Sequence, residues 1–151
     1  MIITSGTYEL IPWNRNELSV RLQSLLQDLK QGLVVTENAL NFALSSPLTE
    51  CIFIVDSEAD VLVGYAELLE WRSATGVAGY VENVVVSVAE QGKAYGTQLV
   101  EQLKIEARKR CLKTIWLHTG AWRTSAQNLY KKHGFMQKDT CVLYLDLEGT
   151  P

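Results

Sequence analysis

The sequence contains few of the residues that build disulfide frameworks or metal centres: three cysteines and two histidines in 151 residues. Cys51, Cys111 and Cys141 form an odd set without C-x-x-C spacing, which predicts reduced, mostly buried thiols in a cytoplasmic protein. His118 and His133 stand apart from other metal-ligating side chains, so the sequence predicts no metal site.

Long apolar runs and concentrated positive charge are also missing. No apolar stretch approaches the ~20 residues that cross a bilayer, and the first residues lack the basic start and long apolar core of a secretory signal. The net charge of −3 argues against a nucleic-acid partner, because such proteins present a concentrated basic face. We therefore expect a cytoplasmic protein that binds neither membranes nor nucleic acid.

The length suits a single domain spanning residues 1–151, without repeats, low-complexity tracts or linkers. Periodicity and turn residues predict strands at 7–11, 51–55, 61–69, 80–88, 114–117, 135–136 and 140–147, a loop at 71–79, and helices at 18–29, 37–44, 97–111 and 124–132. The expected caps are Asn14 or Asn16, Thr36, and Thr124 or Ser125. This order predicts an α/β sheet of mixed direction with helices on both faces.

The helix expected at residues 97–111 ends in a basic cluster of Arg108, Lys109 and Arg110. Positive charge suits the negative C-terminal end of the helix dipole. We interpret the cluster as a solvated face, with Glu106 and Arg110 paired one turn apart.

The most informative stretch is a strand, a glycine-bearing turn and a helix in direct succession, at residues 81–111. A β-branched run ending at Val88 leads into a polar turn with Gly92 and Gly96, and the helix follows at once. The first N–H groups of a helix lack intrahelical partners and carry partial positive charge, so the arrangement predicts a phosphate or pyrophosphate ligand. The spacing fits neither the dinucleotide fingerprint nor the P-loop.

Four motifs here resemble those of the GNAT superfamily of N-acetyltransferases. The run 91–96, QGKAYG, resembles the acetyl-CoA loop (Q/R)-x-x-G-x-(G/A), with Ala94 at the central glycine. Alanine suits that position only if it does not need positive φ. Residues 81–86, VENVVV, resemble the strand (I/V)-E-D-(V/I)-x-V of small-amine acetyltransferases, with Asn83 replacing the Asp. Residues 119–123 match T-G-x-x-R, and residues 126–135 match A-x-x-x-Y-x-x-x-G-F.

The resemblance covers residues 80–135 and implies a GNAT fold. That fold is α/β (α+β in some schemes), with a mixed, mostly antiparallel sheet of six to seven strands and about four helices. It also implies transfer of the acetyl group of acetyl-CoA to the primary amine of a small molecule, by direct attack in a ternary complex. A homodimer is a further expectation from the family.

Two residues are candidates for the proton transfers that the implied reaction needs. Glu82 is the candidate base, because a carboxylate among valines is partly desolvated and suits proton abstraction, directly or through water. The alternative is a strand-end Glu that faces solvent or pairs with an Arg. Tyr130 is the candidate general acid, since a phenol stays protonated at neutral pH. The alternative is a buried tyrosine that packs on Leu99 or Phe135.

The remaining candidate site residues concern binding. The implied contacts to acetyl-CoA are made by the strand backbone, by the loop and by one cation: Val84, Val85, Val86, Gln91, Gly92, Lys93, Ala94, Tyr95, Gly96, Thr97 and Arg123. Two other interpretations of Arg123 stay open, namely a contact to the acceptor and an exposed cation on the surface. Trp13, Trp71 and Trp122 are candidate walls of the acceptor pocket.

Two other functions stay open at this stage. A protein or peptide N-acetyltransferase would need an open peptide groove. A non-catalytic sensor that binds acyl-CoA would tolerate the two departures from the family motifs, Ala94 and Asn83.

Overall fold

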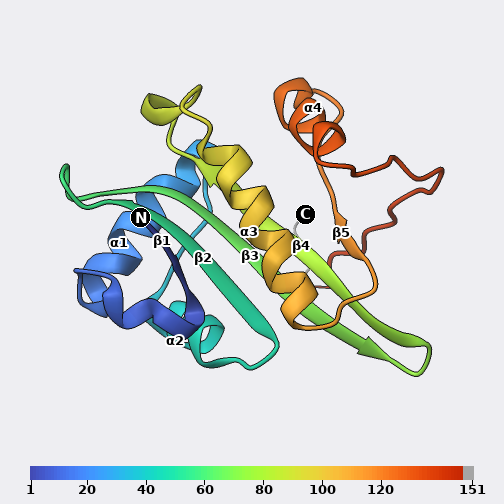
Figure 1. Cartoon of the computed structure of the whole chain (residues 1–151), viewed down its shortest axis with the longest axis horizontal. Coiled ribbons are helices and arrows are strands. Elements are labelled where there is room, and N and C mark those ends of the chain that lie inside the picture. The colour runs from blue at the N-terminus through green and yellow to red at the C-terminus, as the bar shows by residue number, and fades with distance from the viewer. Residues whose placement is uncertain (148–151) are drawn as a thin grey trace.

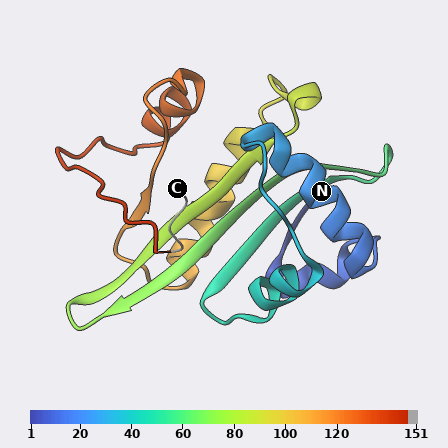
Figure 2. The same ribbon diagram turned by 180° about the vertical axis from the view of Figure 1, so that it is seen from behind.

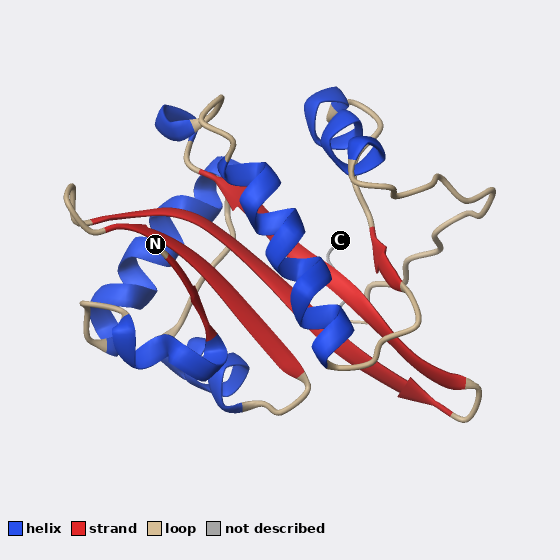
Figure 3. Ribbon diagram, viewed as in Figure 1, coloured by secondary structure: helices blue, strands red, loops and turns tan. Residues whose placement is uncertain are grey.

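The computed structural model describes residues 1–147, which form one mixed β-sheet with helices on both faces (Figure 1, Figure 3). Within these residues the sheet has five strands in the order β1-β2-β3-β4-β5, antiparallel except for the parallel pair β4–β5. The elements are β1 (Ile2–Thr4), the 3-10 helix η1 (Ser5–Leu10), α1 (Arg15–Leu29), α2 (Glu37–Ser45), β2 (Thr49–Asp56), β3 (Val61–Ser73), β4 (Gly76–Val86), the 3-10 turn η2 (Val88–Glu90), α3 (Tyr95–Lys109), β5 (Ile115–Leu117) and α4 (Thr124–Lys132). The predicted mixed, mostly antiparallel α/β fold is confirmed. The last four positions of the domain predicted over 1–151 lie outside the described residues.

Each face of the sheet has its own apolar core. α1 and α2 cover one face and α3 covers the other (Figure 2). On the first face, leucines at helical spacing meet Phe53 and Tyr65 of the sheet; they are Leu18, Leu22, Leu25, Leu26, Leu40 and Leu44. On the second face, Leu99 and Leu103 of α3 pack against Ile52. Because β2 lies between both layers, all of its residues except Asp56 are buried.

The helices of the N-terminal half begin where their caps predict. Asn14 accepts a hydrogen bond from the Glu17 N–H (3.0 Å), and the Glu17 carboxylate accepts one from the Asn14 N–H (2.9 Å). This capping box starts α1, and Thr36 caps α2 by accepting from the Ala39 N–H at 3.1 Å. The predicted cap of α4 is wrong, because Arg123 precedes that helix and makes no side-chain capping bond.

The first strand lies earlier than predicted. Residues 7–11 belong mostly to η1, and the strand that pairs with β2 is Ile2–Thr4, with Ile3 opposite Phe53. The Thr4 N–H donates to the Thr7 hydroxyl at 3.1 Å. Such a local side-chain bond competes with the ladder and favours a turn over a strand.

The loop predicted at residues 71–79 is also wrong. β3 and β4 extend into a long hairpin whose connection is only Ala74 and Thr75, with Ser73 opposite Gly76. The small residues that suggested a loop belong to the two strands of this hairpin, and their backbone groups are paired across it. Trp71 on this hairpin is 59% exposed.

The strands predicted at 135–136 and 140–147 do not form, so the described sheet has fewer strands than the six to seven expected. Large side chains of this C-terminal segment are exposed: Met136, Val142, Leu143, Tyr144, Leu145 and Leu147. A β-branched and aromatic pattern reports how well a segment fits a pleated, half-buried surface. It does not by itself supply a partner strand.

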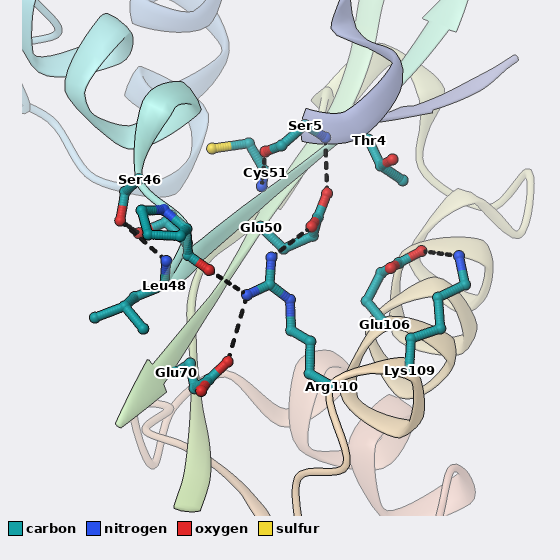
Figure 4. A network of polar contacts seen from close by, with 12 residues as sticks. Thr4, Ser5, Ser46, Leu48, Glu50, Cys51, Glu70, Glu106, Lys109 and Arg110 are labelled. Atoms are coloured by element: carbon teal, nitrogen blue, oxygen red, sulfur yellow. Dashed lines mark hydrogen bonds and ion pairs between the residues drawn. The ribbon is translucent and has the colours of Figure 1, made fainter. Parts of the chain in front are cut away.

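Arg110 ties the C-terminal end of α3 to the sheet (Figure 4). Its guanidinium donates to Glu50 at 2.7 Å, to the Pro47 carbonyl at 2.8 Å and to Glu70 at 3.5 Å. Both carboxylates are more than nine-tenths buried. The predicted pair of Glu106 with Arg110 is therefore wrong, and Glu106 binds Lys109 and Gln102 instead. Arg110 does not belong to a solvated basic face, because its guanidinium pairs with two buried carboxylates.

The three cysteines are free thiols in different surroundings: Cys51 is buried, and Cys111 and Cys141 are exposed. The prediction of mostly buried thiols is wrong. Burial raises the pKa of the Cys51 thiol to about 11, and its sulfur lies 3.4 Å from the Tyr65 hydroxyl oxygen. A search for membrane-spanning helices among residues 1–147 finds none of sufficient length and apolarity.

Replacing Arg110 with Ala leaves Glu50 and Glu70 buried without their shared cation, so we expect the free energy of unfolding to fall by about 3 kcal/mol. Urea denaturation measures this. The matched control is Arg108→Ala on the exposed side of the same helix end, expected within about 0.5 kcal/mol of the parent. Equal losses in both variants would contradict the role given to Arg110.

Thiol labelling separates the cysteines. With an aromatic disulfide reagent at pH 8, Cys111 and Cys141 react promptly, whereas Cys51 reacts only after unfolding. With a pKa of about 11, its thiolate fraction at pH 8 is about one thousandth, and its sulfur is buried. The denatured protein, in which all three thiols label, is the control. Three fast thiols in the native protein would contradict the burial of Cys51.

Candidate active site

The site begins where β4 and β5 part. Their parallel pairing covers only three positions, Gly79–Val81 against Ile115–Leu117, after which β5 ends and β4 continues to Val86. Gly79 permits the pairing, since a Cβ there would lie 2.8 Å from Leu112 and from Leu68. The edge of β4 from Glu82 onward is therefore not covered by β5, and it faces the start of α4.

A β-bulge lies in this part of β4, in its pairing with β3. Val85 of β4 is opposite Tyr65 and Glu82 is opposite Glu67, so β4 has one extra residue between these pairs. Asn83 lies in this interval and has a φ of 52°. Asparagine is among the few residues other than glycine that adopt this left-handed conformation readily. The Asn that departs from the family's Asp is thus compatible with the bulge, which bends the strand beside the cleft.

The parting strands leave a cleft of about 310 Å³. Four segments line it: the end of α1 with the connection that follows, the bulged part of β4, the residues after β5, and α4 with its preceding residue. The lining residues are Leu29, Lys30, Leu33, Val81, Glu82, Asn83, Val84, Leu117, His118, Thr119, Arg123 and Tyr130. Volumes near 300 Å³ are at the lower end for ligand pockets, so the cleft suits a small molecule.

Glu82 and Tyr130, which are far apart in the sequence, line this same cleft. The Glu82 side chain is exposed, whereas those of Val81 and Val85 are buried. The prediction that Glu82 is desolvated among valines is therefore wrong. Tyr130 is 8% exposed and packs edge-on against Phe135, with ring centroids 5.6 Å apart. Burial raises the pKa of Tyr130, partly opposed by Arg123. Its phenol therefore stays protonated at neutral pH.

Arg123 lines the cleft and also connects two distant elements. Its Nη2 donates to the Leu29 carbonyl at 2.6 Å, at the C-terminal end of α1. That end of a helix carries partial negative charge and carbonyls without intrahelical donors, so a guanidinium is favoured there. The bond places the cation at the cleft beside Lys30, a residue that sequence reasoning missed.

His118 directly follows β5 and lines the cleft. Its ring packs edge-on against Tyr80, whose hydroxyl is 3.0 Å from Nε2. The signal in the sequence was its position directly after a short strand, where parallel sheets place functional side chains. His133 caps the end of α4 and its Nδ1 bonds Glu101 at 2.7 Å.

The turn before α3 contains two residues with positive φ. Gly92 has a φ of 85° and Ala94, which immediately precedes α3, has a φ of 64°. The condition set for Ala94 is therefore not met, because its position does require positive φ. The N–H groups of Tyr95, Gly96 and Thr97 occupy the first turn, where helical partners are missing.

The other predicted binding residues are placed as follows. Gln91 is exposed in the turn, and Lys93 is paired with Glu90 at 2.8 Å, which raises the Lys93 pKa. Gly96 lies against α4, since a Cβ there would be 3.1 Å from Leu129. Val84 lines the cleft, whereas the side chains of the next two residues pack into the cores on opposite faces.

The tryptophans do not form the cleft. Trp13 donates to Asp60 at 2.6 Å, Trp71 lies on the exposed hairpin, and Trp122 is 81% exposed and rests over Gly120. None of the three is among the lining residues, so their predicted role as pocket walls is wrong. Within residues 1–147 no cluster of three His, Cys, Asp or Glu side chains could hold a metal ion.

Comparison with known proteins gives matches to a family and to individual relatives. The model of the acetyltransferase (GNAT) family matches residues 20–135. An L-methionine sulfoximine/L-methionine sulfone acetyltransferase of Salmonella typhimurium is 39% identical over 83 residues, 54% of this chain and 48% of the relative. The chain thus matches about half the length of that curated relative.

Solved structures share the fold at low identity. An acetyltransferase of Trypanosoma brucei superposes with a TM-score of 0.76 at 19% identity, over 97% of this chain and 99% of that one. Glucosamine-6-phosphate N-acetyltransferase of Arabidopsis thaliana superposes with a TM-score of 0.77 at 18% identity, over 97% and 98%.

The strained loop position is testable by a pair of substitutions. Ala94→Gly removes the penalty of a left-handed alanine, and we expect the free energy of unfolding to rise by about 0.5–1 kcal/mol after allowing for the greater chain entropy of glycine. Gly92→Ala is the matched opposite change. Its Cβ meets no atom within 4 Å, so any loss, about 1–2 kcal/mol, reports backbone strain alone. Thermal denaturation of both checks the signs, and a loss on Ala94→Gly would refute the strain.

Proposed function

Because the chain belongs to the acetyltransferase (GNAT) family, we propose that it transfers the acetyl group of acetyl-CoA to the primary amine of a small molecule. The observation that carries this proposal is the shared cleft of Glu82 and Tyr130. A carboxylate and a protonated phenol lie on one cleft beside the bulged edge of β4. A base for the ammonium and an acid for the departing sulfur are the two groups that the reaction needs.

The proposed binding of acetyl-CoA uses the loop and the strand before it. The N–H groups from Gln91 to Thr97 hold the pyrophosphate at the N-terminus of α3, where Gly92 and Ala94 already have the conformation that turns backbone N–H groups toward an anion. The backbone of Val84–Val86 runs from the cleft toward this loop, so the pantetheine arm aligned along it brings the thioester to Glu82 and Tyr130.

In the proposed step, the substrate ammonium first gives a proton to Glu82, directly or through one water. The amine nitrogen then attacks the thioester carbonyl, so that a C–N bond forms and the C–S bond breaks with its electron pair on sulfur. The Tyr130 hydroxyl supplies the proton to that sulfur, and the second proton released by the nitrogen restores the phenol through solvent. Because burial raises the pKa of Tyr130, its phenol is protonated and able to donate at neutral pH.

Two observations favour a small acceptor over a peptide. The cleft measures about 310 Å³, which is small for a ligand pocket. The Salmonella typhimurium relative is named for acceptors that are derivatives of a single amino acid. A sensor without turnover is the second candidate, favoured by Ala94 in the loop.

Calorimetric titration with acetyl-CoA, with NADH as the control ligand, tests the loop. We expect saturable one-to-one binding of acetyl-CoA and none of NADH. Release of CoA on addition of primary amines then tests the transfer. Binding without CoA release from any amine would support the sensor, and no binding at millimolar acetyl-CoA would refute the cofactor assignment.

Glu82→Gln and Tyr130→Phe each remove one proton-transfer group at nearly constant volume. We expect each to lower kcat at least tenfold, about 1.4 kcal/mol of barrier, with the Kd of acetyl-CoA changed less than twofold. Steady-state kinetics and calorimetry measure the two quantities. Lys132→Gln on the exposed end of α4 is the control. If neither substitution slows transfer, the assigned base and acid are wrong.

A further inference from the structure

The cleft carries more positive than negative charge, although the whole chain has a net charge of −3. Its lining includes two permanent cations, Lys30 and Arg123, and one carboxylate, Glu82. The nearby carboxylate of Glu67, opposite Glu82 on β3, accepts from the Tyr65 hydroxyl at 2.6 Å and is not part of the lining. Resting on the acetyl transfer proposed above, we propose that the acceptor is an α-amino acid with a neutral side chain.

Both cations line the cleft, and the end of α1 links their positions. Arg123 donates through Nη2 to the carbonyl of Leu29, the residue directly before Lys30, so the guanidinium lies next to the backbone that carries the lysine. A guanidinium has five N–H donors, and this bond uses one of them. The remaining donors and the Lys30 ammonium form a corner that binds a carboxylate, because charge-assisted hydrogen bonds to carboxylates are the strong ones.

The position of Lys30 supports a role for its side chain in the cleft. Its backbone N–H donates to the Leu26 carbonyl and ends α1, while its side chain is exposed at the cleft. The exposed ammonium is thus available to a ligand, and the partial negative charge of the helix end favours a cation there. Replacing it does not disturb the apolar core beneath α1.

The rest of the lining selects the other parts of the acceptor. Glu82 attracts the ammonium that is to be acetylated, and Leu33, Val84 and Leu117 provide apolar wall for a neutral side chain. Amines with several positive charges, such as polyamines and aminoglycosides, meet two cations and one carboxylate in this cleft. Their additional charges are therefore repelled, whereas an amino acid places one charge at each end of the site.

The test compares α-amino acids that have neutral side chains with the corresponding amino-acid amides. The amide has the same side chain and amine but no carboxylate. Its amine, with a pKa near ~8, is also more fully deprotonated at neutral pH and so has the intrinsic advantage as a nucleophile. We expect wild-type kcat/KM to be at least tenfold higher for the acids. A preference for the amides, or for spermidine, would overturn the proposal.

Lys30→Gln assigns the preference to the corner. We expect it to lower kcat/KM for the acids at least tenfold through KM, while values for the amides stay within about twofold. Lys132→Gln, an exposed lysine of α4 away from the lining, should change neither substrate class. An equal loss for acids and amides would overturn the proposed carboxylate contact, because a merely structural role lowers both.

Binding distinguishes failure of this inference from failure of acetyl transfer. Calorimetric titration of the same amino acids in the presence of CoA reports the contact without turnover. Binding that is weakened by Lys30→Gln supports the carboxylate corner even when no CoA is released, and in that outcome only the proposed transfer fails. Amine acetylation without preference for a carboxylate leaves the transfer standing and removes the corner.

Discussion

The short parallel pairing of β4 with β5 is the constraint on which the site depends. Three positions are paired, and beyond them the two strands have no bonds to each other. Gly79 allows β5 to approach β4, and the bulge at Asn83 bends β4 past the end of the pairing. A longer ladder would cover the edge of β4 from Glu82 onward and leave no cleft. The candidate base, the apolar wall of Val84 and the approach of α4 all follow from this early parting.

α3 is anchored at one end and exposes its backbone at the other. At its C-terminal end Arg110 binds two buried carboxylates, which fixes the helix on the sheet (Figure 4). At its N-terminal end the first N–H groups follow Ala94 in a strained conformation and lack helical partners. The fully buried side chains of Leu99 and Leu103 hold α3 on the sheet, and this packing offsets the strain at Ala94.

Local patterns predicted much of the fold. The helix caps at Asn14 and Thr36 each depend on neighbouring residues, and each was confirmed. Failures came where a segment's state depends on distant partners. The residues 71–79 look like a loop but are paired in a hairpin, and residues 140–147 look like a strand but are not paired within the described chain.

The sequence by itself determined the family, the strand-turn-helix that forms the loop, and Glu82 and Tyr130 as candidates, because these depend on short motifs with fixed spacing. Only the tertiary structure decided which side chains share the cleft. Arg123 donates a hydrogen bond to the carbonyl of Leu29, which directly precedes Lys30 and lies 94 positions earlier in the chain. No local pattern predicts that contact, since it joins the end of α1 to the residue before α4, which are far apart in the sequence. The same holds for Arg110, whose two carboxylates come from β2 and β3 and not from its own helix.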